Sequence, residues 1–128
     1  MKVLLSSVVL ILALSACAAS QPGTELVDAQ QAQQILQQQN VQVLDIRTPA
    51  EFADGHLVNA RNLDFYASDF AEQLKQLDPK APYVMYCASG RRSAEAHLQM
   101  KAMGFEQVYE IQGGYQAWQS QNLPVQTP

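Results

Sequence analysis

The chain has 128 residues, and its 8 basic and 12 acidic side chains give a formal net charge of -4 at pH 7. This length suits one domain and is too short for two well-packed ones. The acidic balance, without a cluster of basic residues, excludes the electrostatic footprint of a nucleic-acid-binding protein, so no nucleic-acid partner is expected.

The first residues have the pattern of a targeting segment. Met1-Lys2 is a short basic start, and residues 3–14 form a largely apolar run that is too short for a membrane-spanning helix, which needs about 20 residues. Small residues stand directly before Cys17, in an arrangement that resembles the bacterial lipobox. Residues 1–16 are therefore predicted to be a lipoprotein signal peptide, with Cys17 as the lipidated first residue of the mature chain. An ordinary cleaved secretory signal is the alternative.

Lipidation of Cys17 would decide where the protein works. Residues 17–24 are small and polar, which suits a flexible lipidated tether between the anchor and the domain. The expected location is the bacterial cell envelope, with the domain anchored to a membrane and facing the periplasm, and Ala18 after the anchor slightly favours the outer membrane. Cys87 would then be the only free thiol of the mature chain. Structural cysteines in an oxidising compartment are usually paired, so an unpaired one indicates reactivity or a buried bystander.

Residues 25–128 are predicted to form the domain, in which short apolar strands alternate with helices. Asp28 and Gln31 have the spacing of a capping box, and Thr48-Pro49 has the form of a helix start. The glutamine-rich stretch 30–42 is interpreted as a solvated helix face and not as a disordered tract, because alanines and Ile35-Leu36 interrupt it at helical intervals. We expect strands at 25–27, 41–46, 60–63, 83–86 and 108–111, and helices after Asp28, at 49–54, at 68–77, between Cys87 and Gly104, and at 115–121.

This alternation predicts an α/β fold with one sheet of about five mainly parallel strands and helices on both faces. Ligands of such folds bind at the carboxyl ends of the strands. Asp45, Cys87 and Gly113 all lie at or just past predicted strand ends. We therefore expect them to meet at one crevice although they are far apart in the sequence.

Cys87 is the candidate nucleophile, because it lies between the end of a strand and the start of a helix. Backbone N–H groups in a tight turn before a helix converge on a concavity that favours negative charge, and the helix dipole adds to this effect. A thiol in this position is expected to have a pKa below its free value of about 8.5, so that part of it is thiolate at neutral pH. Thiolate is the form of cysteine that attacks.

Three segments resemble the rhodanese family, namely residues 45–56 (DIRTPAEFADGH), 87–93 (CASGRRS) and 113–118 (GGYQAW). The likeness extends over about residues 25–123 in the order and spacing of that family. It implies a single rhodanese-like domain that transfers sulfane sulfur through a cysteine persulfide. It also implies that Cys87 is the nucleophile at the start of a six-residue loop that ends at Arg92.

The resemblance also implies roles for the residues around Cys87. Four residues separate Cys87 from Arg92, whereas the related phosphatase loop has five and holds a larger tetrahedral anion. Ser93 is expected to cap the helix or to hydrogen-bond the sulfur. Arg92 should orient the loop or meet the anion, and Arg91 should be exposed and guide anions to the mouth. The residues expected to bind the substrate are Ala88, Ser89, Gly90, Arg91, Arg92 and Ser93. Asp45, Arg47 and Glu51 are expected mainly to brace the site through ion pairs, with Arg47 the best candidate among them for a further direct contact with the substrate.

The leading hypothesis is a sulfurtransferase of the thiosulfate type. Cys87 would take sulfur from thiosulfate or a related persulfide donor and pass it to a thiol or cyanide, with a protein as a further option for the acceptor. A rhodanese-like binding or sulfur-carrier module with little turnover is the alternative, and an arsenate reductase or phosphatase is disfavoured by the short loop. No cofactor is expected, and neither cysteines nor histidines have zinc-ligand spacing. A general-base role for His56 is disfavoured, because an ionised thiol needs no base, and His97 is expected to lie at the surface or in packing.

Overall fold

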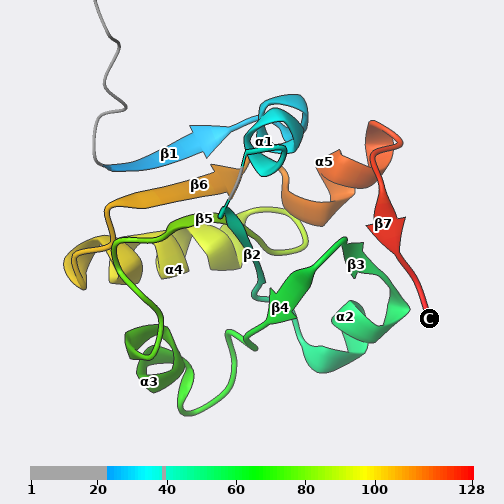
Figure 1. The fold of residues 1–128 in the computed structure, drawn as a ribbon. Helices are drawn as coiled ribbons and strands as arrows, with labels where there is room; N and C mark the ends of the chain where they lie inside the picture. The colour runs from blue at the N-terminus through cyan, green and yellow to red at the C-terminus, as the bar shows by residue number, and fades with distance from the viewer. Residues whose placement is uncertain (1–22, 39) are drawn as a thin grey trace, which may run out of the picture.

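A five-stranded parallel sheet forms the centre of the protein. The computed structural model describes residues 23–38 and 40–128. The strands lie in the order β1 (Gly23–Val27), β6 (Gln107–Ile111), β5 (Pro82–Tyr86), β2 (Gln42–Asp45) and β4 (Ala60–Asn62), and every neighbouring pair is parallel (Figure 1). The predicted α/β fold with a parallel sheet is therefore confirmed.

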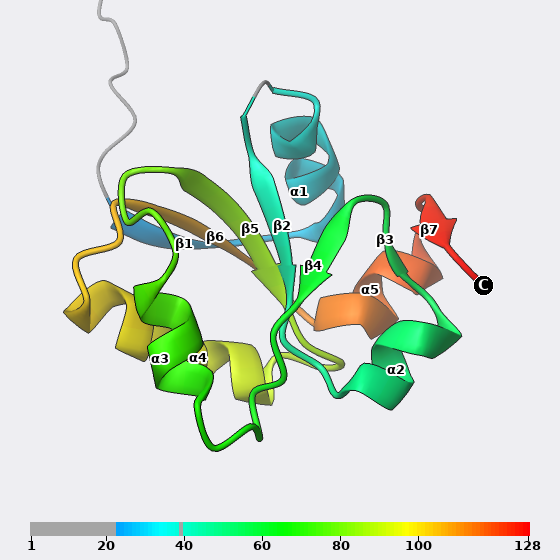
Figure 2. The same cartoon turned by 60° about the horizontal axis from the view of Figure 1, so that its bottom comes forward.

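Helices cover both faces of this sheet. On one face lie α1 (Ala29–Leu36) and α5 (Gly114–Ser120), and on the other lie α3 (Phe70–Lys75) and α4 (Arg91–Ala102), as the two cartoon views show (Figures 1 and 2). The short helix α2 (Pro49–Asp54) follows β2 and buries no residue of its own. It lies beside the carboxyl end of the sheet, where the crevice was predicted (Figure 2).

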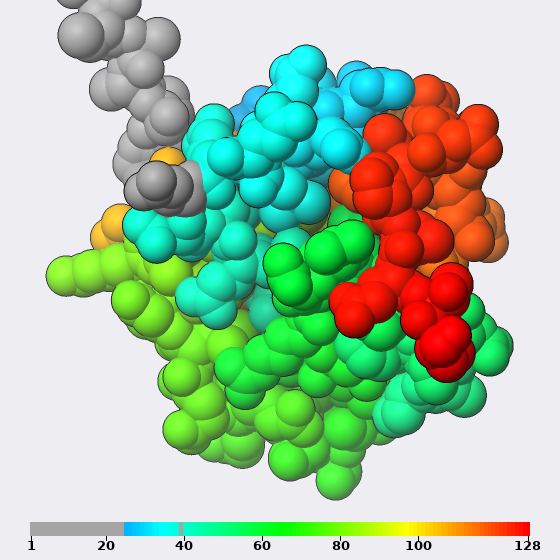
Figure 3. Space-filling model, turned by 45° about the vertical axis from the view of Figure 1, so that its right-hand side comes forward, coloured from blue at the N-terminus to red at the C-terminus, as the bar shows by residue number. Residues whose placement is uncertain are grey.

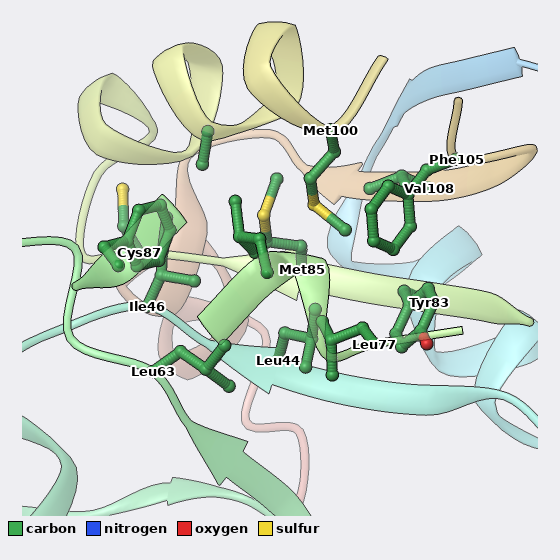
Figure 4. Close-up of a cluster of buried hydrophobic side chains, with 13 residues drawn as sticks. Leu44, Ile46, Leu63, Leu77, Tyr83, Met85, Cys87, Met100, Phe105 and Val108 are labelled. Carbon is green, nitrogen blue, oxygen red and sulfur yellow. The ribbon is translucent and has the colours of Figure 1, made fainter. Parts of the chain in front are cut away.

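Two hydrophobic clusters fill the spaces between the sheet and its helices. The α3/α4 cluster includes Leu44, Met85 and Met100, all of them fully buried. Figure 4 shows Cys87 at one end of this cluster, with Tyr83 and Phe105 at the other. The second cluster packs α1 and α5 against the opposite face and includes Trp118. Because side chains alternate along a strand, Tyr86 faces the α1/α5 cluster while Cys87, the next residue, faces the α3/α4 cluster.

Local sequence signals set most helix starts as predicted. Asp28 accepts a hydrogen bond from the N–H of Gln31 and the Gln31 side chain accepts one from the N–H of Asp28, so both halves of the capping box form. Thr48 caps α2 in the same way with Glu51. Two elements differ from the predicted ranges by two residues at an end. The helix α3 is shorter than 68–77, and β1 begins at Gly23, so the end of the predicted tether belongs to the sheet.

A second, two-stranded antiparallel sheet was not predicted. It pairs β3 (His56–Leu57) with β7 (Val125–Gln126). In the space-filling view the C-terminal residues, in red, lie against the green segment that includes β3 (Figure 3). Strands of two residues carry no readable periodicity, and this pair forms only because the fold brings distant segments together.

The prediction of a signal peptide, of Cys17 lipidation and of most of the tether concerns residues outside the described part of the chain. Within residues 23–38 and 40–128, no helix combines the length and the apolar character needed to cross a membrane.

The core makes a testable prediction about stability. Met100→Ala should lower the free energy of unfolding by about 2–5 kcal/mol, because the lost side chain leaves a cavity in a close-packed cluster. Leu98→Ala is the matched control, since Leu98 lies on the same helix but is 67% exposed, and it should change that free energy by no more than about 0.5 kcal/mol. Urea unfolding followed by circular dichroism measures both; equal losses would contradict this description of α4.

Candidate active site

Three strand ends meet at the carboxyl edge of the sheet. Cys87 directly follows β5, Asp45 is the last residue of β2, and Gly113 lies two residues past β6. These three strands are neighbours in the order β6, β5, β2. The sheet thus brings together the strand ends that hold the three predicted segments.

The sulfur of Cys87 is buried and surrounded by hydrogen-bonding groups. The N–H of Gly90 donates to Sγ at 3.1 Å, and Oγ of Ser93 lies 3.5 Å from Sγ. Burial favours the neutral thiol and is the largest single influence on the pKa of Cys87. The hydroxyl of Ser93 and the N–H groups of Ser93, Gly90 and Ser89 act together in the opposite direction, so the pKa of Cys87 is lowered. This geometry stabilises negative charge at Sγ.

The loop keeps its shape because backbone contacts hold it from outside. Gly90 has a φ of 111°, in the left-handed region that favours glycine, and α4 begins at the next residue. The N–H of Tyr115 donates to the carbonyl of Cys87 at 2.8 Å, and that of Gln116 donates to the carbonyl of Ala88 at 3.1 Å. With the carbonyls of the loop engaged by the start of α5, its N–H groups are left to face the sulfur.

Gly114 makes this close approach of α5 feasible. A Cβ atom at this position would lie only 2.8 Å from the carbonyl oxygen of Ala88 and closer still to that of Cys87. A side chain would therefore push α5 away from the loop. The sequence resemblance included this glycine, and the packing supplies its physical reason.

A polar pocket of about 420 Å³ opens above Cys87. The predicted residues Cys87, Ser89, Arg91, Arg92 and Glu51 line it, and so do two residues that were not predicted to belong to the site, Thr48 and Tyr66. Ala88, Gly90 and Ser93 do not line the pocket, but their backbone or hydroxyl groups take part in the loop contacts described above. Tyr66 comes from the segment between β4 and α3, where no motif marks it.

Arg92 is held by Glu51 in a two-pronged ion pair. Nη1 and Nη2 of Arg92 donate to the two carboxylate oxygens of Glu51 at 2.8 and 2.9 Å, and Glu51 also accepts from the N–H and hydroxyl of Thr48. The hydrogen bonds from Arg92 are the main reason that the pKa of Glu51 is lowered from 4.5 to about 2. The same pair raises the pKa of Arg92. Glu51 thus forms the kind of ion pair that was expected of it.

Arg91 is exposed and carries charge that is free to meet an anion. Its Nη2 donates to the hydroxyl of Tyr66 at 3.3 Å. Within the described ranges it makes no ion pair. The pocket therefore contains one arginine neutralised by Glu51 and one that is not.

Asp45 and Arg47 form a buried ion pair on the other face of the sheet. Nη2 of Arg47 donates to Oδ2 of Asp45 at 2.6 Å, and Tyr86 donates its hydroxyl to the same oxygen at 2.6 Å. The Arg47 guanidinium also donates to the carbonyl of Gly55 and lies 4.1 Å from the ring centroid of Tyr115. Burial and the neighbouring Asp45 raise the pKa of Tyr86.

This position differs from the predicted role of Arg47 in substrate binding. Arg47 is 4% exposed and does not line the pocket around Cys87. Its partner Asp45 and the partner's neighbour Tyr86 face the α1/α5 side, whereas Cys87 faces the α3/α4 side. The guanidinium follows its carboxylate partner, and so it braces the site from behind as Asp45 was expected to do.

A second buried carboxylate, Glu110, lies close to the nucleophile and was not predicted. Ser93 donates its hydroxyl to Oε1 of Glu110 at 2.9 Å, while Nδ1 of His97 lies 3.2 Å from Oε2 without the alignment of a good hydrogen bond. Glu110 is only 6% exposed, on β6. A charged residue inside the otherwise apolar and aromatic predicted strand 108–111, VYEI, was the available sequence signal.

A second pocket differs in character from the pocket at Cys87. This second pocket, of about 340 Å³, lies on the α1/α5 side, is lined mainly by apolar side chains such as Leu36, Val41 and Trp118, and contains no charged residue. Within residues 23–38 and 40–128, no three His, Cys, Asp or Glu side chains are grouped so as to ligate a metal ion. The pocket at Cys87 is therefore the candidate active site.

The fold and the site together define a class of protein, namely parallel α/β domains with a buried cysteine in an anion-binding loop. Residues 28–121 match the family of rhodanese-like domains, and the chain belongs to that family. It is 32% identical to thiosulfate sulfurtransferase GlpE of Pseudomonas putida over 101 residues, which cover 79% of this chain and 89% of the relative. It is 36% identical to the protein of the same name from Pseudomonas aeruginosa over 91 residues, which cover 71% of this chain and 80% of that one.

Solved structures show the same fold. A rhodanese-related protein from Thermoplasma volcanium superimposes with a TM-score of 0.73 at 28% identity, over 81% of this chain and 99% of the other. A thiosulfate sulfurtransferase from Pseudomonas aeruginosa superimposes with a TM-score of 0.70 at 26% identity, over 88% of this chain but only 21% of the longer protein.

The Glu51–Arg92 pair predicts how stability depends on pH. Because folding lowers the pKa of Glu51 from 4.5 to about 2, its contribution to stability is present above pH 4.5 and is lost as the pH falls towards 2. Glu51→Gln should therefore be less stable than wild type at neutral pH, and the difference should shrink through this range. Urea unfolding at a series of pH values measures it. Glu72→Gln, at an exposed pair with Lys75, is the control and should change little; a pH-independent loss for Glu51→Gln would contradict the assignment.

Proposed function

We propose that this protein is a sulfurtransferase that carries sulfane sulfur as a persulfide on Cys87. The observation that supports this most directly is the position of Sγ, which is buried, accepts the N–H of Gly90 at 3.1 Å and opens onto the pocket of Arg91. A loop of this kind stabilises an anion whether the charge lies on the thiolate or on an added sulfur. The named relatives are thiosulfate sulfurtransferases, which makes thiosulfate the first donor to test.

In the loading step the Cys87 thiolate attacks the outer sulfur of thiosulfate. The bond between the two donor sulfurs breaks, its electron pair leaves with sulfite, and a new S–S bond forms on Cys87. The negative charge moves from Sγ to the terminal sulfur of the persulfide. Arg91 offers an unpaired cation at the mouth for the doubly charged donor, while Arg92, fixed by Glu51, supports the loop.

In the unloading step a nucleophilic acceptor attacks the terminal sulfur. Cyanide takes it as thiocyanate, and a thiol takes it as a new persulfide; in both cases the electron pair of the broken S–S bond returns to Sγ of Cys87. The N–H of Gly90 and the other loop groups that lower the pKa of Cys87 also make it a better leaving group. The pocket of about 420 Å³ has room for an acceptor larger than cyanide.

Intact-mass spectrometry tests this proposal. Incubation with thiosulfate should add the mass of one sulfur atom to the wild-type protein, and cyanide should remove it. Cys87→Ser should gain none, because the described residues contain no other free cysteine and Cys17 is expected to carry a lipid. Leu98→Ala, an exposed change on α4, is the control and should load like the wild type. A wild-type protein that gains no sulfur from thiosulfate, polysulfide or another persulfide donor would refute the function.

We further propose that Cys17 carries a lipid that anchors the domain at the periplasmic side of a bacterial membrane, with the outer membrane slightly favoured. The support is the basic start, the apolar run and the small residues before Cys17. Expression of the full chain in a bacterium with a labelled fatty acid should label the wild type but not Cys17→Ser. Cys87→Ser is the control and should stay labelled. Equal labelling of wild type and Cys17→Ser, or none in either, would contradict the anchor.

A further inference from the structure

Behind Cys87, away from the pocket, lies a row of buried polar groups that the loading reaction does not use. Ser93 is fully buried on α4, with its Oγ 3.5 Å from Sγ of Cys87 and 2.9 Å from Oε1 of Glu110. Nδ1 of His97, one helical turn after Ser93, lies 3.2 Å from the other oxygen of Glu110. The carboxylate is thereby enclosed by α4 and connected to the nucleophile through one hydroxyl.

The hydroxyl of Ser93 has a single proton and more than one acceptor. Oγ lies within hydrogen-bonding distance of Oε1 of Glu110 and, at 3.2 Å, of the carbonyl oxygen of Gly90. The contact with Glu110 is the shortest of these. When the proton points to Glu110, Ser93 cannot donate to Sγ and can only accept a hydrogen bond from the neutral Cys87 thiol. When the proton points to Sγ, it stabilises the thiolate. Glu110 and the thiolate therefore compete for one proton.

We infer, on the basis of the proposed function, that Glu110 is a positioning residue for sulfur loading. Its carboxylate draws the Ser93 proton away from Sγ and places a second negative charge behind the thiolate, which raises the free energy of the unloaded thiolate. In the persulfide the charge has moved from Sγ to the terminal sulfur, farther from Glu110. Ser93 can then donate its proton to Glu110 without removing a hydrogen bond from a charged Sγ. Glu110 thus favours the loaded state over the unloaded one.

The other ionisable groups near this row are on the pocket side and on α4. Arg92, paired with Glu51, and Arg91 face the pocket in front of Cys87. His97 contacts Glu110 from α4, and Met85 is the register partner of Glu110 on β5 and carries no charge. Glu110 is therefore the carboxylate that meets the Ser93 hydroxyl directly, while Glu51 is held in front by Arg92.

The inference is tested first without any sulfur transfer. The rate at which iodoacetamide alkylates Cys87 is measured against pH for the wild type, Glu110→Gln, Ser93→Ala and the double variant. Glu110→Gln should move the midpoint of this pH profile to lower pH by about one unit, because a neutral amide no longer withholds the Ser93 proton from the Cys87 thiolate. In the Ser93→Ala background the same change should move the midpoint by less than half as much. Glu95→Gln, an exposed change on α4, is the control and should not move it.

A second measurement follows the loading equilibrium. At a pH above both alkylation midpoints and a fixed ratio of thiosulfate to sulfite, intact-mass spectrometry should show a ratio of persulfide to free Cys87 that is about tenfold lower in Glu110→Gln than in wild type, as a one-unit change implies when free Cys87 is ionised. An unchanged or raised alkylation midpoint in Glu110→Gln would overturn the inference. So would an undiminished shift in the Ser93→Ala background, which would mean that Glu110 acts without the hydroxyl.

These outcomes are separable from a failure of the proposed function. If the wild type takes up no sulfur from any donor, the sulfurtransferase assignment fails, while the alkylation profiles still report whether Glu110 controls Cys87 through Ser93. If Glu110→Gln does not fold, as judged by circular dichroism, Glu110→Ala replaces it, because it removes the same carboxylate. It should likewise move the midpoint of the alkylation profile to lower pH, and an unchanged or raised midpoint would overturn the inference.

Discussion

The buried ion pair of Asp45 and Arg47 is the interaction on which the rest of the site depends. One carboxylate at the end of β2 accepts hydrogen bonds from the Arg47 guanidinium and from the hydroxyl of Tyr86 on β5. The same guanidinium also donates to the carbonyl of Gly55, just before β3, and lies over the ring of Tyr115 on α5. Breaking such a pair leaves an uncompensated buried charge, at a cost of about 3–5 kcal/mol. The intact ion pair thus joins four chain segments at one edge of the sheet, namely the ends of β2 and β5, the residue before β3, and α5.

This fixed edge explains how a short loop can control one sulfur atom. Tyr115 is held by Arg47, and its N–H holds the carbonyl of Cys87. The loop is thereby oriented with its N–H groups towards Sγ of the buried Cys87, where such dipoles act more strongly than in water. On the opposite face, Ser93 approaches the same sulfur from α4, and Glu110 on β6 contacts the Ser93 hydroxyl. The nucleophile is thus set between a frame that stabilises its charge and a carboxylate that opposes it.

Particular residues show how far sequence reasoning reached. The capping box at Asp28 and the helix start at Thr48-Pro49 were readable because both signals lie within a few residues of the helix end, and both form as predicted. The Cys87 turn was readable because a strand end, a glycine and a helix start follow one another. The sequence left open whether Arg47 braces the site or contacts the substrate, because its role depends on which face of the sheet its partner occupies. Alternation along β2 and β5 decides that only once the strands are paired. Glu110 and Tyr66 were missed for a similar reason, since Glu110 meets Ser93 and Tyr66 meets Arg91 only across the fold.

The sequence by itself determined the order of strands and helices, the parallel α/β class and the position of the nucleophile, because these follow from local periodicity, capping and turn chemistry. Only the tertiary structure decided which charges meet. It paired Arg92 with Glu51, left Arg91 at the mouth and turned Arg47 to the far side. It also placed Glu110 behind Ser93. Electrostatic partners are chosen by distance in space, and residues 41 or 17 positions apart become neighbours only when the sheet has formed.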